Sequence, residues 1–320
     1  MKIRHIVLAA FAATALSAQA QDFPSKPLTL LVPFPPGGST DMVARVIAEK
    51  LQAGLGRTVV VENRPGAGAQ IAASVLMKAN ADGHTLMIGD TGALAVNTTL
   101  YPKLSFDPLK DFAPVTALVS TPLVLVVSSG SKAAKASDIV AQAKQTPQGL
   151  SYASQGIGTI GHLLGEQLRV RSGGQFHHVA YKGSAPALQD VIGGQVDMLF
   201  DPVSTAWPMI TGGKVKALGV AAARRSPALP QVPTLAEAGV PGVEGSVWWG
   251  MVVKAGTPPA AVDRLNAEIR KALDSPDVSK RFEELGLEST PMSPQRFGEF
   301  LKAEVARWAP IVKASGASVD

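Results

Sequence analysis

Two glycine-rich loops in this chain have the residue types and spacing to bind an anion through backbone N–H groups. The first, residues 33–39, follows the apolar run 28–32 and contains Gly37 and Gly38. Glycine has no Cβ, so a ligand can approach its backbone closely. A helix is predicted to begin next, capped by Ser39 or Thr40, and free N–H groups at a helix start attract negative charge. The alternative is a tight strand-to-helix turn.

The second loop, residues 154–159, contains a G-x-G-x-x-G pattern formed by Gly156, Gly158 and Gly161. A dinucleotide-binding loop of this kind needs an acidic residue about 20 positions later, at the end of the next strand. That strand, residues 176–181, ends before Lys182 instead. The sequence therefore argues against a nicotinamide cofactor, and we expect no cofactor. Either this loop is a second anion-accepting helix start, or it is a glycine turn with Thr159 as the helix cap.

Catalytic constellations are scarce. The sequence has no G-x-S-x-G or H-E-x-x-H motif, and its His, Asp and Glu residues show no spacing typical of a metal site. His162 follows the second loop, and a packing or capping role is favoured over a position in the cleft. Asp201 ends an apolar strand, where it can meet a ligand hydroxyl or ammonium, or cap the helix at Thr205. Asp41 would repel an anion, so we expect it to brace the first loop.

The N-terminus has the features of a signal peptide. Lys2 and Arg4 precede an apolar stretch over residues 6–17, and Ala18 and Ala20 fit the small-x-small cleavage rule. We predict removal of residues 1–20; an uncleaved anchor would need a longer apolar run. The chain has no cysteine, which excludes disulfides and a lipid-modified N-terminal cysteine. These features predict a periplasmic protein that is not lipid-anchored, with full secretion as the alternative.

Composition limits the partners further. The 320-residue chain is 46% hydrophobic and 17% charged, which is typical of a globular protein of one large or two smaller domains. Without residues 1–20 it carries 28 basic and 25 acidic side chains, a net charge of +3. No basic stripe is present, so we expect no nucleic-acid partner. The weak positive charge modestly favours anionic ligands.

Strands and helices alternate in two series, which predicts an α/β fold. The first series has strands at 28–32, 58–62 and 85–89, helices at 41–53 and 70–78, and β runs at 115–119 and 123–127. The second has helices at 136–145, 160–169, 185–192 and 205–211 and strands at 150–153, 176–181, 196–200, 215–221 and 247–253. A helical tail follows at 260–273, 278–285 and 294–315.

Such alternation predicts parallel sheets covered by helices on both faces. The restart after Pro122 predicts a second lobe, and the helical tail predicts a return to the first. We therefore expect two mainly parallel sheets with flanking helices, divided into lobe 1 (residues 21–121 and 246–320) and lobe 2 (residues 122–245). The cleft between the lobes would be lined by loops at the carboxyl ends of strands.

Several runs, in a fixed order, resemble one receptor family. They are Phe23-Pro24 with Pro27, VPFPPGG at 32–38 with Asp41 and Arg45, VENRPGAG at 61–68, ADGHTL at 81–86, YKG at 181–183 and VPTLAEAG at 232–239. Over essentially the whole chain after residue 20, the sequence resembles the Bug (TctC-like) extracytoplasmic solute-binding receptors. These are the binding components of tripartite tricarboxylate transporters.

The resemblance implies a two-lobed periplasmic-binding-protein (type II-like) fold that closes on a small organic anion. In the family, one ligand carboxylate meets the first loop through backbone amides and ordered water. The second lobe contributes the second glycine loop and the loop after the next strand, and neighbouring strand ends contribute further candidates. Carried over, the ligand-binding residues are Pro36, Gly37, Gly38, Ser39, Ser154, Gly158, Thr159, Gly183, Ser184, Thr91, Asn97 and Asp201.

The function expected from this resemblance is capture of a small carboxylate and its delivery to the membrane permease of a tripartite tricarboxylate-type transporter. Two alternatives stay open: a receptor that serves a sensor kinase, and a periplasmic enzyme that acts on a carboxylate with Asp201 and His162 as acid and base. We expect a monomer with no catalytic or metal-binding residues. The family spans di- and tricarboxylates, amino acids and aromatic acids, so the resemblance does not name the ligand.

Overall fold

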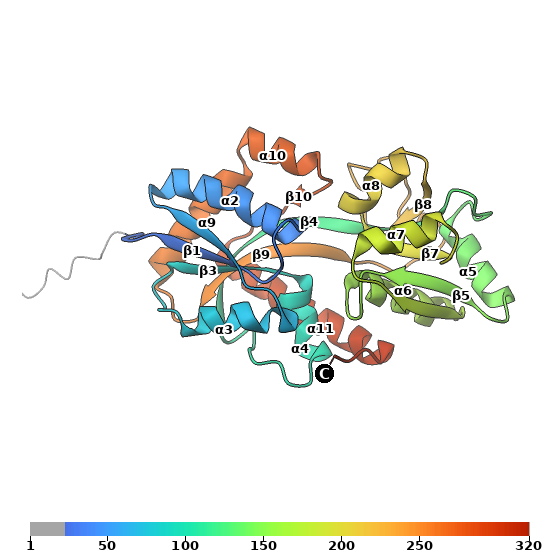
Figure 1. Ribbon diagram of the computed structural model, residues 1–320, viewed down its shortest axis with the longest axis horizontal. Helices are drawn as coiled ribbons and strands as arrows, with labels where there is room; N and C mark the ends of the chain where they lie inside the picture. Colours follow the sequence, from blue (N-terminus) through green and yellow to red (C-terminus); the bar gives the residue numbers. More distant parts are fainter. Residues whose placement is uncertain (1–22, 320) are drawn as a thin grey trace, which may run out of the picture.

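The computed structural model describes residues 23–319, so the predicted signal peptide lies outside the described residues. The chain forms two α/β lobes joined by long strands (Figure 1). Across residues 23–319, none of the helices combines the length and the apolar character that a membrane span requires.

The first lobe is built on four short strands and flanking helices. Its strands are β1 (Leu28–Val32), β2 (Val59–Asn63), β3 (Thr85–Asp90) and the two-residue β10 (Glu288–Ser289). Its helices are α2 (Ser39–Leu55), α3 (Gln70–Lys78), α9 (Pro259–Leu273), α10 (Pro276–Glu283) and α11 (Pro294–Ser315), with short helical turns η2 (Ala67–Ala69), η3 (Gly92–Val96) and α4 (Asn97–Leu100).

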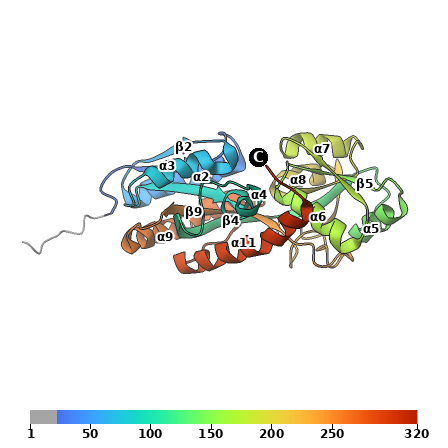
Figure 2. The same ribbon diagram turned by 90° about the horizontal axis from the view of Figure 1, so that it is seen from below.

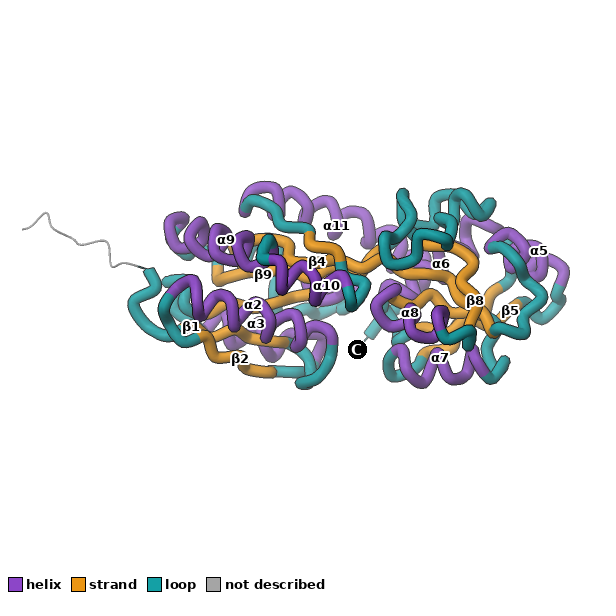
Figure 3. Tube along the Cα trace, turned by 90° about the horizontal axis from the view of Figure 1, so that it is seen from above, coloured by secondary structure: helices purple, strands orange, loops and turns teal. Residues whose placement is uncertain are grey.

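The second lobe repeats this plan. Its strands are β5 (Leu150–Ser154), β6 (Phe176–Ala180), β7 (Met198–Pro202) and β8 (Val215–Val220). Its helices are α5 (Ala136–Gln145), α6 (Ile160–Ser172), α7 (Ser184–Ile192) and α8 (Val203–Thr211). The strands β4 (Phe112–Ser128) and β9 (Ser246–Lys254) connect the lobes, and the tube view follows them from one lobe into the other (Figure 3).

Strand pairing is parallel within each βα series and antiparallel at the long connecting strands. β1 pairs in parallel with β2 and β3, and β5 pairs in parallel with β6 and β7. β9 pairs antiparallel with β3 and β4, and β4 pairs antiparallel with β7 and β8. The alternation of strands and helices predicts the first group; it does not encode the second.

The two β runs predicted on either side of Thr121-Pro122 are one continuous strand, so the predicted break is wrong. Up to Pro122, β4 pairs with β9, where Pro122 lies opposite Ser246. From Leu123 onward β4 pairs with β7, and from Val124 with β8. Proline cannot donate to a ladder. It is accommodated here because it sits where the strand exchanges one set of partners for another.

Alternation along the strands buries side chains on both faces of the first sheet. Leu30 faces a cluster with α2 and α9 that includes Ile47 and Leu265, whereas its neighbour Leu31 faces the side of α3. The second face continues under both lobes, because α11 contacts β4 and also α6. Figure 2 shows α11 running beneath the first lobe and reaching α6.

Candidate functional site

A cavity of about 270 Å³ lies between the two lobes. Its wall comes from segments far apart in the sequence, and the described residues that form it include no Lys, Arg or His. First-lobe segments supply Phe34, Gly68, Ala69, Asp90, Thr91, Gly92, Ala93, Asn97, Leu100, Tyr101 and Val319. The second lobe and the connecting segments supply Gln155, Ile157, Gly158, Thr159, Ile160, Pro202 and Val247.

The first-lobe wall is formed where β3 turns directly into the helical segments η3 and α4. Asp90 starts this turn, because its Oδ1 accepts the Ala93 N–H at 2.8 Å. Asn97 follows one turn later and donates from Nδ2 to the Gly68 carbonyl at 3.0 Å. The sequence prediction placed Thr91 and Asn97 near a strand end but missed the helical residues 92–100.

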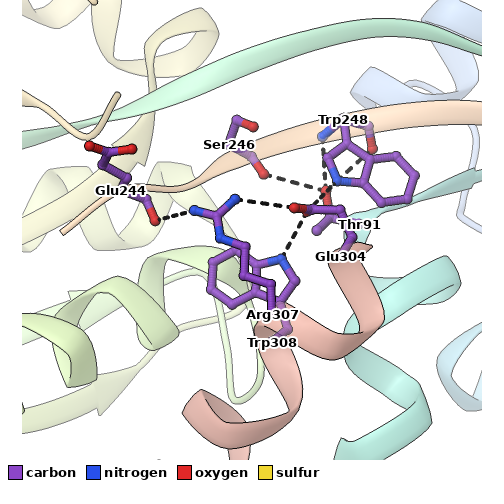
Figure 4. Close-up of polar contacts among 7 residues, drawn as sticks. All are labelled: Thr91, Glu244, Ser246, Trp248, Glu304, Arg307 and Trp308. Atoms are coloured by element: carbon purple, nitrogen blue, oxygen red, sulfur yellow. Dashed lines mark hydrogen bonds and ion pairs between the residues drawn. The ribbon is translucent and has the colours of Figure 1, made fainter. Parts of the chain in front are cut away.

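Thr91 is held from behind by a buried polar cluster (Figure 4). Its Oγ1 accepts the backbone N–H of Trp248 at 2.9 Å, and the Trp248 indole donates to Glu304 at 2.8 Å. Glu304 also accepts from Trp308 at 3.0 Å and from Arg307 at 3.1 Å. We call Trp248, Glu304, Arg307 and Trp308 the Glu304 cluster. It fixes the cavity wall to the connecting strand β9 and to α11.

Arg307 also connects the Glu304 cluster to the segment that precedes β9. Its Nη2 donates to the Glu244 carbonyl at 2.8 Å, just before the strand begins (Figure 4). Both tryptophans of β9, Trp248 and Trp249, are almost fully buried. Trp249 donates from its indole to Thr40 Oγ1 at 2.8 Å. Neither tryptophan covers the cleft; both serve the packing around it.

The second-lobe wall is the glycine loop before α6. Gly158 has a φ of +76°, and a Cβ there would lie 2.2 Å from Cδ2 of Leu100 on the opposite lobe. Its N–H donates to His162 Nδ1 at 3.1 Å. Within the part of the chain that the structure describes, the N–H groups of Ile157 and Ile160 have no hydrogen-bond acceptor. The loop therefore presents free donors beside the cavity, as a helix start can.

The favoured packing role of His162 is confirmed. Its ring stacks on His178 with the centroids 3.9 Å apart, and His178 in turn stacks on Tyr152. The Nε2 of His178 lies 2.6 Å from Ser154 Oγ, which accepts the Gly156 N–H. Burial lowers the pKa of His162, and burial with the neighbouring His162 lowers the pKa of His178 to about 4. Both rings are therefore neutral supports for the loop.

Asp201 does not line the cavity itself but positions Gln155, which does. It is fully buried and accepts from Gln155 Nε2 at 2.8 Å and from Thr205 Oγ1. Burial raises the pKa of its carboxyl group, and the hydrogen bonds from Ser184, Thr205 and Gln155 partly oppose this rise. Gln155 lines the cavity, so Asp201 acts on the site through Gln155.

The first glycine loop is braced as expected but capped differently. The N-cap of α2 is Gly38, without a side-chain hydrogen bond, so the predicted cap by Ser39 or Thr40 is wrong. The Thr40 hydroxyl is engaged by the indole of Trp249 instead. Asp41 accepts the Gly37 N–H at 2.9 Å, which confirms its bracing role.

Hydrogen bonds from neighbouring residues keep the Asp41 carboxyl group ionised. The hydrogen bond from Arg45, at 2.9 Å, is the largest cause that lowers its pKa to about 2, and Gly37 and Asn63 add to it against the effect of burial. The carboxylate is thus occupied by the loop and by α2. The N–H groups of Ser39 and Thr40, in the first turn of α2, have no acceptor within residues 23–319.

The structure brings together only part of the predicted site. Thr91, Asn97, Gly158 and Thr159 line the cavity, and Ser154 and Asp201 lie directly behind it. Six predicted residues do not line this cavity: Pro36, Gly37, Gly38, Ser39, Gly183 and Ser184. Their contact with a ligand stays a prediction.

Sequence reasoning missed several lining residues. Asp90 ends strand β3 next to the predicted residue Thr91, and Gln155 lies within the second glycine loop, so position alone could have found both. Tyr101 and Val319 gave no such signal. Val319 reaches the cavity because the segment after α11 returns to α4, where its N–H lies 3.3 Å from the Leu100 carbonyl. No group of three or more metal-ligating side chains occurs among residues 23–319.

Comparisons with known proteins point to one family. Residues 43–317 match the family TctC, described as "Tripartite tricarboxylate transporter family receptor". A protein of Pseudomonas sp. strain P51, named for the tcbD-tcbE intergenic region, is 41% identical over 95% of this chain and 91% of its own length. Protein BugT of Bordetella pertussis is 36% identical over 98% of this chain and 96% of its own.

Solved structures of periplasmic solute-binding proteins are similar to this chain in fold as well. Rpa4515 of Rhodopseudomonas palustris, solved with adipate, superposes with a TM-score of 0.82 at 37% identity over 93% of this chain and 99% of that one. MatC of the same organism, solved with malate, has a TM-score of 0.77 at 35% identity over 91% and 100%. The periplasmic binding protein BugD has a TM-score of 0.78 at 34% identity over 92% and 99%.

Proposed function

The chain belongs to the TctC family of tripartite tricarboxylate transporter receptors, and from that premise we propose that it captures a small organic carboxylate between its two lobes. One observation carries the proposal. The cavity joins loops of both lobes and offers free N–H groups of Ile157 and Ile160 without any Lys or Arg in its wall. Backbone amides can hold an anion without a paired cation.

The ligands of two relatives support this ligand class. Adipate and malate, bound by Rpa4515 and MatC, are small dicarboxylates. A cavity of about 270 Å³ suits a molecule of that size. The predicted residues of the first loop and of residues 183–184 join the proposal as groups that reach the ligand when the lobes close.

Closure is the proposed mechanism. β4 and β9 connect the lobes, and a ligand that contacts both walls binds the closed arrangement better than the open one. The ligand can shift the equilibrium only by that difference in affinity. Gly158 suits this movement, because its missing Cβ allows the lobes to meet at Leu100.

We further propose that the protein is exported to the periplasm after loss of residues 1–20 and hands its ligand over unchanged. The recipient would be a permease of the tripartite tricarboxylate type, with a sensor kinase as the alternative. The family supports the first partner, because its members are described as transporter receptors.

Thermal unfolding tests the proposal. The purified exported protein is unfolded and refolded to strip bound ligand, then melted with a panel of carboxylates. A compound at a hundredfold excess over its Kd should stabilise the native state by roughly 2.7 kcal/mol. The compound should also be recovered unchanged. No shift with any carboxylate would overturn the proposal, and consumption of the compound would establish an enzyme instead.

A further inference from the structure

Among the described residues that line the cavity, Asp90 is the one carboxylate, and no Lys, Arg or His of residues 23–319 pairs with it. Its Oδ1 accepts the Ala93 N–H at 2.8 Å. Within residues 23–319, no ion pair and no side-chain donor engages this carboxyl group. Aspartate is therefore present where an uncharged cap such as asparagine or serine would also start the turn.

The surroundings of Asp90 disfavour its charged form unless a cation lies near it. Burial raises the pKa of Asp90 above its ordinary value, and the nearby backbone N–H groups of Ala93, Asp90 and Gly92 only partly oppose this rise. Charges withdrawn from water are retained where a partner or a hydrogen bond compensates them. Asp90 is partly exposed at the cavity wall, and within residues 23–319 no Lys, Arg or His pairs with it, so a cationic group of a ligand in the cavity would compensate its charge better than water alone.

Asn97 adds a second acceptor on the same wall. Its Nδ2 donates to the Gly68 carbonyl, which fixes the orientation of the amide and leaves Oδ1 without a partner in the described part of the chain. The side chain is 92% buried and lines the cavity. The opposite wall has the reverse polarity, because Ile157 and Ile160 offer N–H donors there. The cavity thus has an acceptor side in the first lobe and a donor side in the second.

Building on the proposed function, we propose that Asp90 determines specificity and that the ligand is a carboxylate that also carries an ammonium group. The ligand carboxylate accepts hydrogen bonds from the second-lobe N–H groups, and its ammonium group donates to Asp90 and to Oδ1 of Asn97. An ammonium group has donors only, so it satisfies both acceptors. A plain dicarboxylate of the same length would place negative charge beside Asp90 with no cation near it.

Matched ligand sets test this inference by isothermal titration of the refolded protein at neutral pH. Each set differs at one substituent: aspartate, malate and succinate; glutamate, 2-hydroxyglutarate and glutarate; phenylalanine, phenyllactate and phenylpropionate. In the set that fits the cavity, we expect the amino compound to bind at least about tenfold tighter than the unsubstituted one, as a charge-assisted hydrogen bond provides. The hydroxy compound should lie between them.

The variant Asp90→Asn is the matched control. Asparagine keeps an oxygen for the Ala93 N–H and removes the charge, so thermal unfolding should show a folded protein. The preference for the amino compound should fall to about threefold or less, through weaker binding of that compound. Should the variant fail to fold, the ligand ratio of the unaltered protein still decides.

The possible failures are distinguishable. Tighter or equal binding of the unsubstituted acid, or an unchanged amino preference in Asp90→Asn, would overturn the inference and leave the carboxylate receptor intact. Binding of no compound in any set would overturn both the inference and the proposed function.

Discussion

Replacing Glu304 with leucine should destabilise the protein strongly, because one buried carboxylate holds two buried indoles. Trp248 and Trp308 donate to Glu304 at 2.8 and 3.0 Å, and their side chains are 2% and 0% exposed. Leaving a buried donor unpaired costs about 1–3 kcal/mol each, so the two together cost about 2–6 kcal/mol. Arg307 adds little, since its side chain is 40% exposed and can be solvated. Total stabilities are about 5–15 kcal/mol, so the loss should be large in urea unfolding.

The variant Glu304→Gln separates the indole bonds from the ion pair. The amide oxygen can accept from both Trp248 and Trp308, as Glu304 Oε2 does, and only the half-exposed contact with Arg307 is lost. We expect a decrease in the free energy of unfolding of no more than about 1 kcal/mol. Equal effects of leucine and glutamine, or a leucine effect below about 1 kcal/mol, would refute the reasoning about the buried indoles.

Three further predictions concern the two glycine loops and His178, which supports the second of them. Gly158→Ala should weaken carboxylate binding in calorimetry, because its Cβ would lie 2.2 Å from Cδ2 of Leu100 and this side chain of the opposite lobe would have to move. Gly173→Ala is the control: at a similar φ of +66°, with no described atom within 4 Å, it should strain the backbone equally and bind as the unaltered protein does. Equal affinity in both variants would contradict this. Gly38→Val should keep the fold, since a Cβ at this position would meet only the Pro35 carbonyl oxygen, at 3.9 Å. The variant should lose carboxylate binding, because the valine side chain would block close approach of the ligand to the first loop. Unchanged affinity would show that this loop is not part of the site. His178 should make the free energy of unfolding fall as pH drops from 6.5 to about 4, because its ring is protonated in the unfolded chain but stays neutral in the native protein over this range. The loss reaches at most about 3 kcal/mol. Urea titrations in which His178→Phe shows the same loss would disprove it.

The sequence predicted most elements because their signals are local. Strand β1 has the predicted bounds, as do α3 and α5, since each is an apolar or amphipathic run flanked by glycine, proline or polar residues. β4 shows the limit of such signals. In the sequence, Pro122 predicts the end of a strand. The strand continues through it only because β4 changes its pairing partner there, from β9 to β7.

The site was less predictable, because its wall depends on how two lobes meet. Thr91 and Gly158 could be found from their place at strand ends and helix starts. Val319 lines the cavity only because α11 crosses beneath the first lobe and its following segment returns to α4. No spacing in the sequence encodes that contact.

A crystal structure with the carboxylate that stabilises the protein most would test the central claim most directly. The account predicts ligand density in the cavity between the lobes, with carboxylate oxygens within hydrogen-bond distance of the Ile157 and Ile160 N–H groups. A ligand bound outside this cavity, or inside it with its carboxylates turned away from both donors, would contradict the account.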